Sequence, residues 1–131
     1  MLSSFIIQVI RYTLGVCWIY QGLMPKLLTI APLEKALTAT MGFSPAVSDN
    51  ITRAAGVAEI VFGILLIVFY QHRSVHFLNI AALCGLLGYV VFMMPVLLLE
   101  AFNPVTTNIP MMIMSLVLLD HFYGDRLLRA K

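Results

Sequence analysis

The sequence of 131 residues is 61% hydrophobic and 11% charged, whereas a soluble domain carries roughly 25% charged residues. A soluble domain of this length could not bury so much apolar surface. The composition therefore excludes a soluble fold and indicates an integral membrane protein, and the small net charge of +2 excludes a nucleic-acid partner.

The first apolar segment covers residues 4–24 and is about long enough to span a bilayer. It has no preceding basic stretch and no following small-residue cleavage site, and it carries Arg11. Because these features do not match a cleaved signal peptide, we expect a retained transmembrane helix.

The connection over residues 25–50 contains a second, shorter helix. Pro32 suits a first helical position and Gly42 suits a stop, which predicts a helix from Pro32 to Met41. We expect this helix to lie at the membrane interface as a lid. The next helix is expected to be capped by Ser48, Asp49 or Asn50.

Three further spans are predicted, at residues 51–70, 77–99 and 105–123, the last of them interrupted by Pro110. The predicted fold class is all-α: a transmembrane four-helix bundle with a short interfacial helix in the first extracytoplasmic loop. Residues 1–131 are expected to form a single domain.

Basic residues are distributed unequally between the two sides of these spans. One side carries Arg73, Arg126, Arg129 and Lys131, and the other carries Lys26, Lys35 and Arg53. Because lysine and arginine favour the cytoplasmic side, both termini are predicted to be cytoplasmic and the long loop extracytoplasmic.

Two ionisable residues, Arg11 and Glu59, fall inside predicted spans, where each costs about 3 kcal/mol to insert. Helical spacing places Gly15 beside Arg11 and Gly63 beside Glu59, and small residues let helices approach closely in lipid. We therefore expect Arg11 and Glu59 to pair inside the protein, either as an ion pair that fixes helix register or as a ligand or proton site. The other partners open to Arg11 are Asn79 and Asp120.

A second polar group is expected at the extracytoplasmic end. Its members are Tyr20, Gln21, Lys26, Arg53, Asn103, Thr106, Thr107 and Asn108. They serve either as caps and interfacial anchors or as the mouth of a pocket whose cations favour an anionic or quinone-like head group. Trp18, on the Arg11 face, either fills the bundle or stacks on a ligand.

The remaining reactive residues suggest little independent chemistry. Cys17 and Cys84 are expected to be core residues, and a thiol pair is the alternative. His72 and His76 lie four residues apart in a basic turn without a third ligand nearby, so no metal site is predicted.

Three motifs resemble the DoxX-like family of small membrane proteins. They are Arg11-x-x-Leu14-Gly15-x-x-Trp18-Ile19-Tyr20-Gln21-Gly22-Leu23-x-Pro25-Lys26, Arg53-x-x-Gly56-x-x-Glu59-x-x-x-Gly63 and Phe102-Asn103-Pro104-Val105-Thr106. The resemblance implies a four-helix bundle in a bacterial inner membrane. It also implies an association with quinol-linked oxidation, thiol redox or oxidative stress, usually as an accessory subunit.

These observations predict a non-catalytic accessory subunit or a module that binds a small quinone- or lipid-like molecule, without a bound cofactor. The candidate ligand-binding residues are Arg11, Trp18, Gln21, Lys26, Arg53, Glu59, Asn103 and Asn108. The alternatives are a small dimeric proton-coupled transporter that uses Glu59 and a quinone-linked thiol oxidoreductase. Expected partners are the lipid bilayer, a membrane redox protein, or a second copy that contacts Ala81, Gly85 and Gly88.

Overall fold

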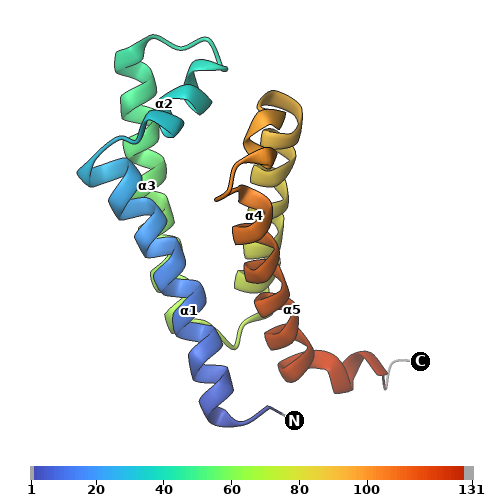
Figure 1. The fold of residues 1–131 in the computed structure, drawn as a ribbon. Helices are drawn as coiled ribbons and strands as arrows, with labels where there is room; N and C mark the ends of the chain where they lie inside the picture. Colours follow the sequence, from blue (N-terminus) through green and yellow to red (C-terminus); the bar gives the residue numbers. More distant parts are fainter. Residues whose placement is uncertain (1, 129–131) are drawn as a thin grey trace. The chain divides into compact units, whose positions relative to one another are not determined.

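The computed structural model describes residues 2–128, and every regular element in that range is helical (Figure 1). The elements, in chain order, are α1 (Ser4–Gly22), the π-helix η1 (Leu23–Leu28), α2 (Pro32–Ala39), α3 (Pro45–Val68), α4 (Arg73–Met93), the 3₁₀ helix η2 (Pro95–Leu99) and α5 (Pro104–Leu128). The predicted all-α class is confirmed.

The chain divides into two compact units. One unit runs from Thr13 to Val68 and holds most of α1 together with η1, α2 and α3. The other holds the start of α1 together with α4, η2 and α5. Each unit is described by itself.

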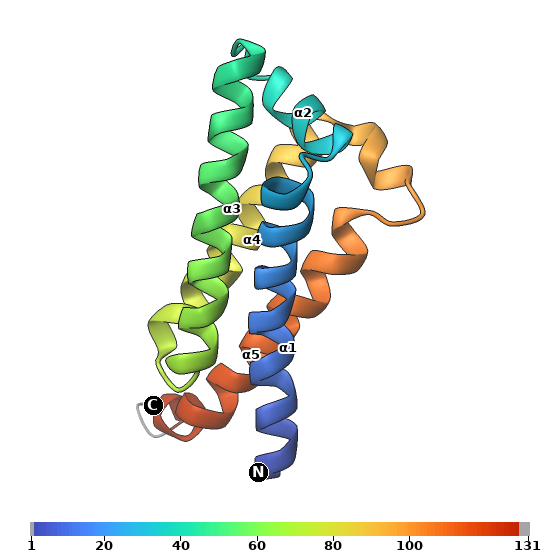
Figure 2. The same cartoon turned by 90° about the vertical axis from the view of Figure 1, so that its left-hand side faces the viewer.

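Glycines bring α1 and α3 into close antiparallel contact, and the two helices run side by side (Figure 2). A Cβ on Gly15 would lie 2.8 Å from the carbonyl oxygen of Gly63, and a Cβ on Gly56 would lie 2.7 Å from that of Gly22. Both distances are too short for any larger residue without a backbone shift. The prediction that these glycine faces turn toward protein is confirmed.

The first span ends in a break at η1. Pro25, which lacks a backbone N–H, lies inside this π-helix, and the chain then bends by 86° between the segment Ser4–Leu28 and α2. Pro32 begins α2 as predicted, but the helix ends at Ala39, two residues before the expected end. Gly42, in the following turn, has a φ of +76°, which glycine adopts without strain.

α3 begins six residues earlier than the predicted span. Its first residue is Pro45, whose fixed φ suits a helix start, and the N–H of Ser48 already donates to the carbonyl of Ser44 at 2.9 Å. The prediction that Ser48, Asp49 or Asn50 caps this helix is therefore wrong, because all three lie within it.

In the other unit, α4 ends at Met93 rather than continuing to residue 99. Pro95 disfavours helical geometry at Met94, which has a φ of −142° and a ψ of 59°, and η2 follows. The predicted unbroken span 77–99 is wrong at this end. α5, in contrast, continues through Pro110.

Within the part of the chain that the structure describes, three helices are long and apolar enough to cross a membrane: α3, α4 and residues 104–124 of α5. The bent pair formed by Ser4–Leu28 and α2 makes a fourth if it is counted as one span. The architecture is consistent with a helical membrane bundle.

Candidate functional site

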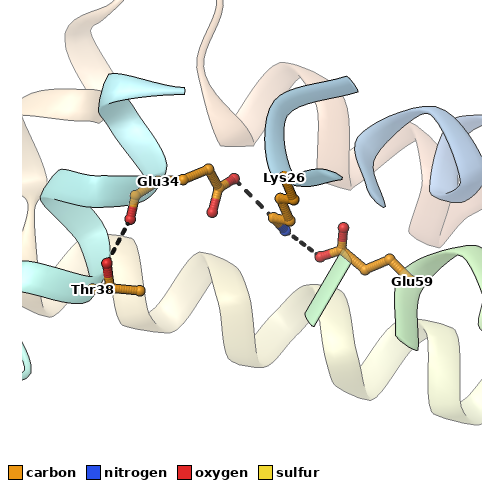
Figure 3. Close-up of polar contacts among 4 residues, drawn as sticks. All are labelled: Lys26, Glu34, Thr38 and Glu59. Carbon is orange, nitrogen blue, oxygen red and sulfur yellow. Dashed lines mark hydrogen bonds and ion pairs between the residues drawn. The ribbon is translucent and has the colours of Figure 1, made fainter. Parts of the chain in front are cut away.

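The most concentrated charge lies where η1, α2 and α3 meet. The ammonium of Lys26, on η1, forms an ion pair with Glu59 Oε1 on α3 and lies 3.6 Å from Glu34 Oε1 on α2 (Figure 3). All three side chains are largely buried, with 11% of the Lys26, 16% of the Glu59 and 20% of the Glu34 side chain exposed. We call Lys26, Glu34 and Glu59 the charge cluster.

The close contact between η1 and α3 positions this cluster. A Cβ on Gly56 would lie 2.9 Å from the Cβ of Lys26, so η1 lies directly on the backbone of α3. Glu59 follows Gly56 by three residues, which is about one helical turn. The Lys26 side chain therefore passes Gly56 and meets Glu59.

The charge cluster contains one cation and two carboxyl groups. Glu59 Oε1 is paired with Lys26, but Glu59 Oε2 is buried without a hydrogen-bond partner. A buried carboxylate oxygen without a partner is costly, so this atom could accept a hydrogen bond from a further donor.

Burial raises the pKa of Glu34 above its ordinary value of 4.5. The nearby charge of Glu59 adds to this effect, while Lys26 opposes it by charge and hydrogen bonding without reversing it. Glu34 therefore holds a proton more tightly than an exposed glutamate does.

Further polar contacts attach α2 to α3. The hydroxyl groups of Thr38 and Ser48 are hydrogen-bonded, and Thr38 Oγ1 lies 2.9 Å from the carbonyl oxygen of Glu34 (Figure 3). Since the Thr38 hydroxyl has one proton, it donates to that carbonyl and accepts from Ser48. An exposed ion pair at 3.9 Å joins Lys35 to Asp49.

The expected ion pair between Arg11 and Glu59 is wrong. Glu59 pairs with Lys26, whereas the Arg11 guanidinium donates to Gln8 Oε1 at 2.9 Å and lies 4.2 Å from the centre of the Tyr70 ring. A cation over an aromatic face is a favourable contact. The packing of α1 on α3 explains this outcome, because Gly15 faces Ile67 and Arg11 lies one turn further from Glu59.

Three other predicted residues lie in the same unit as the charge cluster. Trp18 is 6% exposed and packs edge-on against Phe62, with ring centres 5.1 Å apart. Gln21 is half-buried in the last turn of α1, and Arg53 is exposed on α3. Of the predicted site residues, the structure thus brings Lys26 and Glu59 into contact.

Asn103 and Asn108 lie at the start of α5, in the other unit. Asn103 Oδ1 accepts from the N–H groups of Val105 at 3.0 Å and Thr106 at 3.1 Å, which is a helix cap. Asn108 is 2% exposed; its Oδ1 accepts from Thr107, but its Nδ2 has no hydrogen-bond partner. The expected gathering of these residues with Lys26 and Arg53 stays a prediction.

A buried polar cluster between α4 and α5 was not predicted. His76, Asn79 and Ser115 are each fully buried. Asn79 Nδ2 donates to Ser115 Oγ at 2.8 Å, Ser115 Oγ lies 3.3 Å from His76 Nδ1, and His76 Nε2 lies 2.7 Å from the carbonyl oxygen of Tyr70. Because a carbonyl only accepts, a neutral His76 carries its proton on Nε2, and Ser115 donates to Nδ1.

The sequence analysis placed His76 in a basic turn, which is wrong, because α4 begins at Arg73. Asn108 and Ser115, seven residues apart on α5, are both buried. Glu34 was missed as well. Its position in the first turn of a helix that begins with Pro32 was the available signal.

Cys17 and Cys84 are both free thiols. Cys17 is half-buried, but Cys84 is exposed, so the prediction that Cys84 is a core residue is wrong. Cys84 Sγ lies 3.3 Å from Met112 Sδ. Among the residues that the structure describes, no three His, Cys, Asp or Glu side chains are placed to hold a metal ion.

Comparison with protein families gives a match to the DoxX-like family over residues 15–116. The chain belongs to the DoxX-like family. The match extends from the α1–α3 glycine contact through the charge cluster to Ser115 on α5. Comparisons with curated proteins and with solved structures give no match. Family membership together with three span-length apolar helices makes this a membrane protein.

Proposed function

We propose that the protein is a non-catalytic module of the bacterial inner membrane that binds a small quinone- or lipid-like molecule at the charge cluster. Its place in a redox or stress process is that of an accessory subunit. The observation that carries the proposal is the buried Glu59 Oε2, which lacks a partner beside the Lys26 ammonium.

The chemistry of this pair selects the ligand class. Glu59 Oε2 accepts a hydrogen bond, and the Lys26 ammonium donates, so a complementary head group carries both a hydroxyl donor and an oxygen acceptor. A quinol and the hydroxyl-bearing head group of a lipid meet this requirement, whereas the carbonyl groups of a quinone only accept hydrogen bonds. Apolar tails suit the exposed hydrophobic residues of α1 and α3, such as Val16 and Val57.

Trp18 offers a direct measurement of binding because it is the only tryptophan. It precedes Lys26 by eight residues, roughly 12 Å along the helix, so a ligand at the charge cluster lies close enough to change the indole emission. We expect a short-chain ubiquinol, added without oxygen to the protein in phosphatidylcholine nanodiscs, to quench Trp18 fluorescence with a saturable dependence on concentration.

Glu59→Gln should weaken this binding by roughly tenfold or more, because it replaces a charged acceptor whose hydrogen bonds contribute about 1.5–3 kcal/mol. Lys35→Gln is the matched control, since Lys35 is exposed on α2 and lies outside the charge cluster. Circular dichroism establishes that both variants fold. Quenching that does not saturate, or equal affinities in folded Glu59→Gln and wild-type protein, contradicts the proposal.

A further inference from the structure

The segment that joins α4 to α5 carries apolar side chains that are unusually exposed. Phe92 is 84% exposed, Val96 69%, Leu99 86% and Phe102 97%. We call Phe92–Phe102 the elbow. Its one formally charged residue, Glu100, is also exposed.

These four exposed side chains lie four, three and three residues apart, at the end of α4, in η2 and in the following turn. Phe92 belongs to α4, and its face continues back along that helix through Gly85 and Leu78, seven residues apart, where both positions are exposed. The elbow is therefore continuous with an exposed face of a helix that is long and apolar enough to span the membrane.

The length of α4 places the elbow at the edge of the hydrocarbon layer. α4 has 21 residues, which corresponds to about 31 Å and matches a hydrocarbon thickness of about 30 Å. η2 begins two residues after α4 ends, so its side chains are within reach of the acyl chains and glycerol groups of that leaflet.

Several backbone groups in the elbow are bonded within the chain, as contact with lipid requires. The N–H of Leu97 donates to the carbonyl of Met94 at 3.0 Å, and the N–H of Glu100 donates to that of Leu97 at 3.4 Å. Asn103 Nδ2 donates to the carbonyl of Glu100 at 2.9 Å. The apolar side chains can thus enter lipid without exposing unpaired backbone at these positions.

We propose that the elbow is an interfacial lipid anchor, with Val96, Leu99 and Phe102 inserted among the acyl chains of the leaflet at this end of α4. Its partner is the bilayer itself. Because the elbow carries no basic residue, insertion is driven by apolar burial and does not require anionic lipid. This proposal stands apart from ligand binding at the charge cluster, which lies in the other unit.

Site-directed spin labelling of the full chain tests the anchor. In a Cys17→Ala/Cys84→Ala background, labels are attached to Leu99→Cys and, as a neighbouring control, Glu100→Cys, in nanodiscs of pure phosphatidylcholine. We expect the label at residue 99 to collide several-fold more often with oxygen than with a water-soluble nickel chelate. The label at residue 100 should show the reverse preference.

Phe102→Cys provides an independent second position, with the behaviour of residue 99 expected. Equal nickel access at residues 99 and 100 would show that the elbow lies in water and would overturn the proposal. Exclusion of both reagents from residue 99, with spin–spin broadening between labels, would show that a second copy covers the face and would also overturn it.

Discussion

At the scale of single residues, the α4–α5 polar cluster shows how buried polar groups can be satisfied inside an apolar hairpin. Ser115 accepts from Asn79 and donates to His76, while His76 donates to the Tyr70 carbonyl. Each hydrogen bond fixes the direction of the next one. The cluster therefore fixes the relative position of α4 and α5 more specifically than apolar packing alone can do.

Ser115→Ala should destabilise the protein by about 1–3 kcal/mol. It removes the hydroxyl group that donates to His76 Nδ1 and accepts from Asn79 Nδ2, and both residues are fully buried. Thermal unfolding in detergent measures the effect, and Ser74→Ala, at an exposed position of the same hairpin, is the control. Equal unfolding temperatures for the two variants would show that the cluster contributes nothing to stability.

Residue types indicated which faces turn inward, but they did not determine which residues meet. Periodicity predicted that Glu59 faces protein, and this is confirmed by its pairing with Lys26. Its partner was predicted wrongly because glycine spacing does not reveal how far α1 and α3 are displaced along each other. Gly15 lies eleven residues after the start of α1 at Ser4, yet it faces Gly63, five residues before the end of α3 at Val68.

That axial offset of six residues, about 9 Å, follows from glycine contacts between helices. A single sequence shows the glycines but not which of them meet. The missed α4–α5 polar cluster has a similar cause, since it depends on where α4 begins.

At the scale of helices, prolines and their neighbours carried most of the boundary information. Pro32 marks the start of α2, and Asn103 caps α5 directly before Pro104. Pro45 marks the start of α3, and Pro95 marks the break after α4. The sequence around each proline also fits a different helix boundary, namely the predicted start at residue 51 and the predicted end at residue 99. Hydropathy predicts how much chain is apolar, whereas local backbone geometry decides where each helix stops.

The attachment of α2 should depend on pH through Glu34. Because its pKa is raised in the folded protein, the folded state binds the proton more tightly than the unfolded chain does. Stability from this group is therefore gained as pH falls toward 4.5 and lost as pH rises through the folded value. We expect wild-type protein to gain thermal stability relative to Glu34→Gln on acidification from neutral pH.

Unfolding temperatures of wild type and Glu34→Gln, compared at several pH values, measure this difference. Lys35→Gln keeps the Glu34 carboxyl group and should retain the wild-type trend. A constant difference between wild type and Glu34→Gln, or one that shrinks on acidification, would show that burial does not raise this pKa in the membrane protein.

At the scale of the whole molecule, the number of crossings decides where the termini lie. α3, α4 and α5 each have the length and composition of a span, and the segment Ser4–Leu28 joins them if it crosses before the chain bends into α2. Four crossings put both termini on one side, and the basic residues after α3 and α5 favour the cytoplasm. Three crossings would put the termini on opposite sides of the membrane. The charge cluster would then lie at the end of a segment, α1 and η1, that does not cross the bilayer.

Reporter fusions distinguish these arrangements. Green fluorescent protein fused to the N-terminus, or in a second fusion to the C-terminus, should fluoresce. Alkaline phosphatase inserted at Gly42, in the turn between α2 and α3, should be active, because the enzyme folds only outside the cytoplasm. Phosphatase fused to the C-terminus is the matched control and should be inactive. Activity of that fusion, with an inactive insertion at Gly42, would reverse the proposed orientation. Loss of fluorescence from the N-terminal fusion, with the other results unchanged, would mean that α1 and η1 do not cross the bilayer.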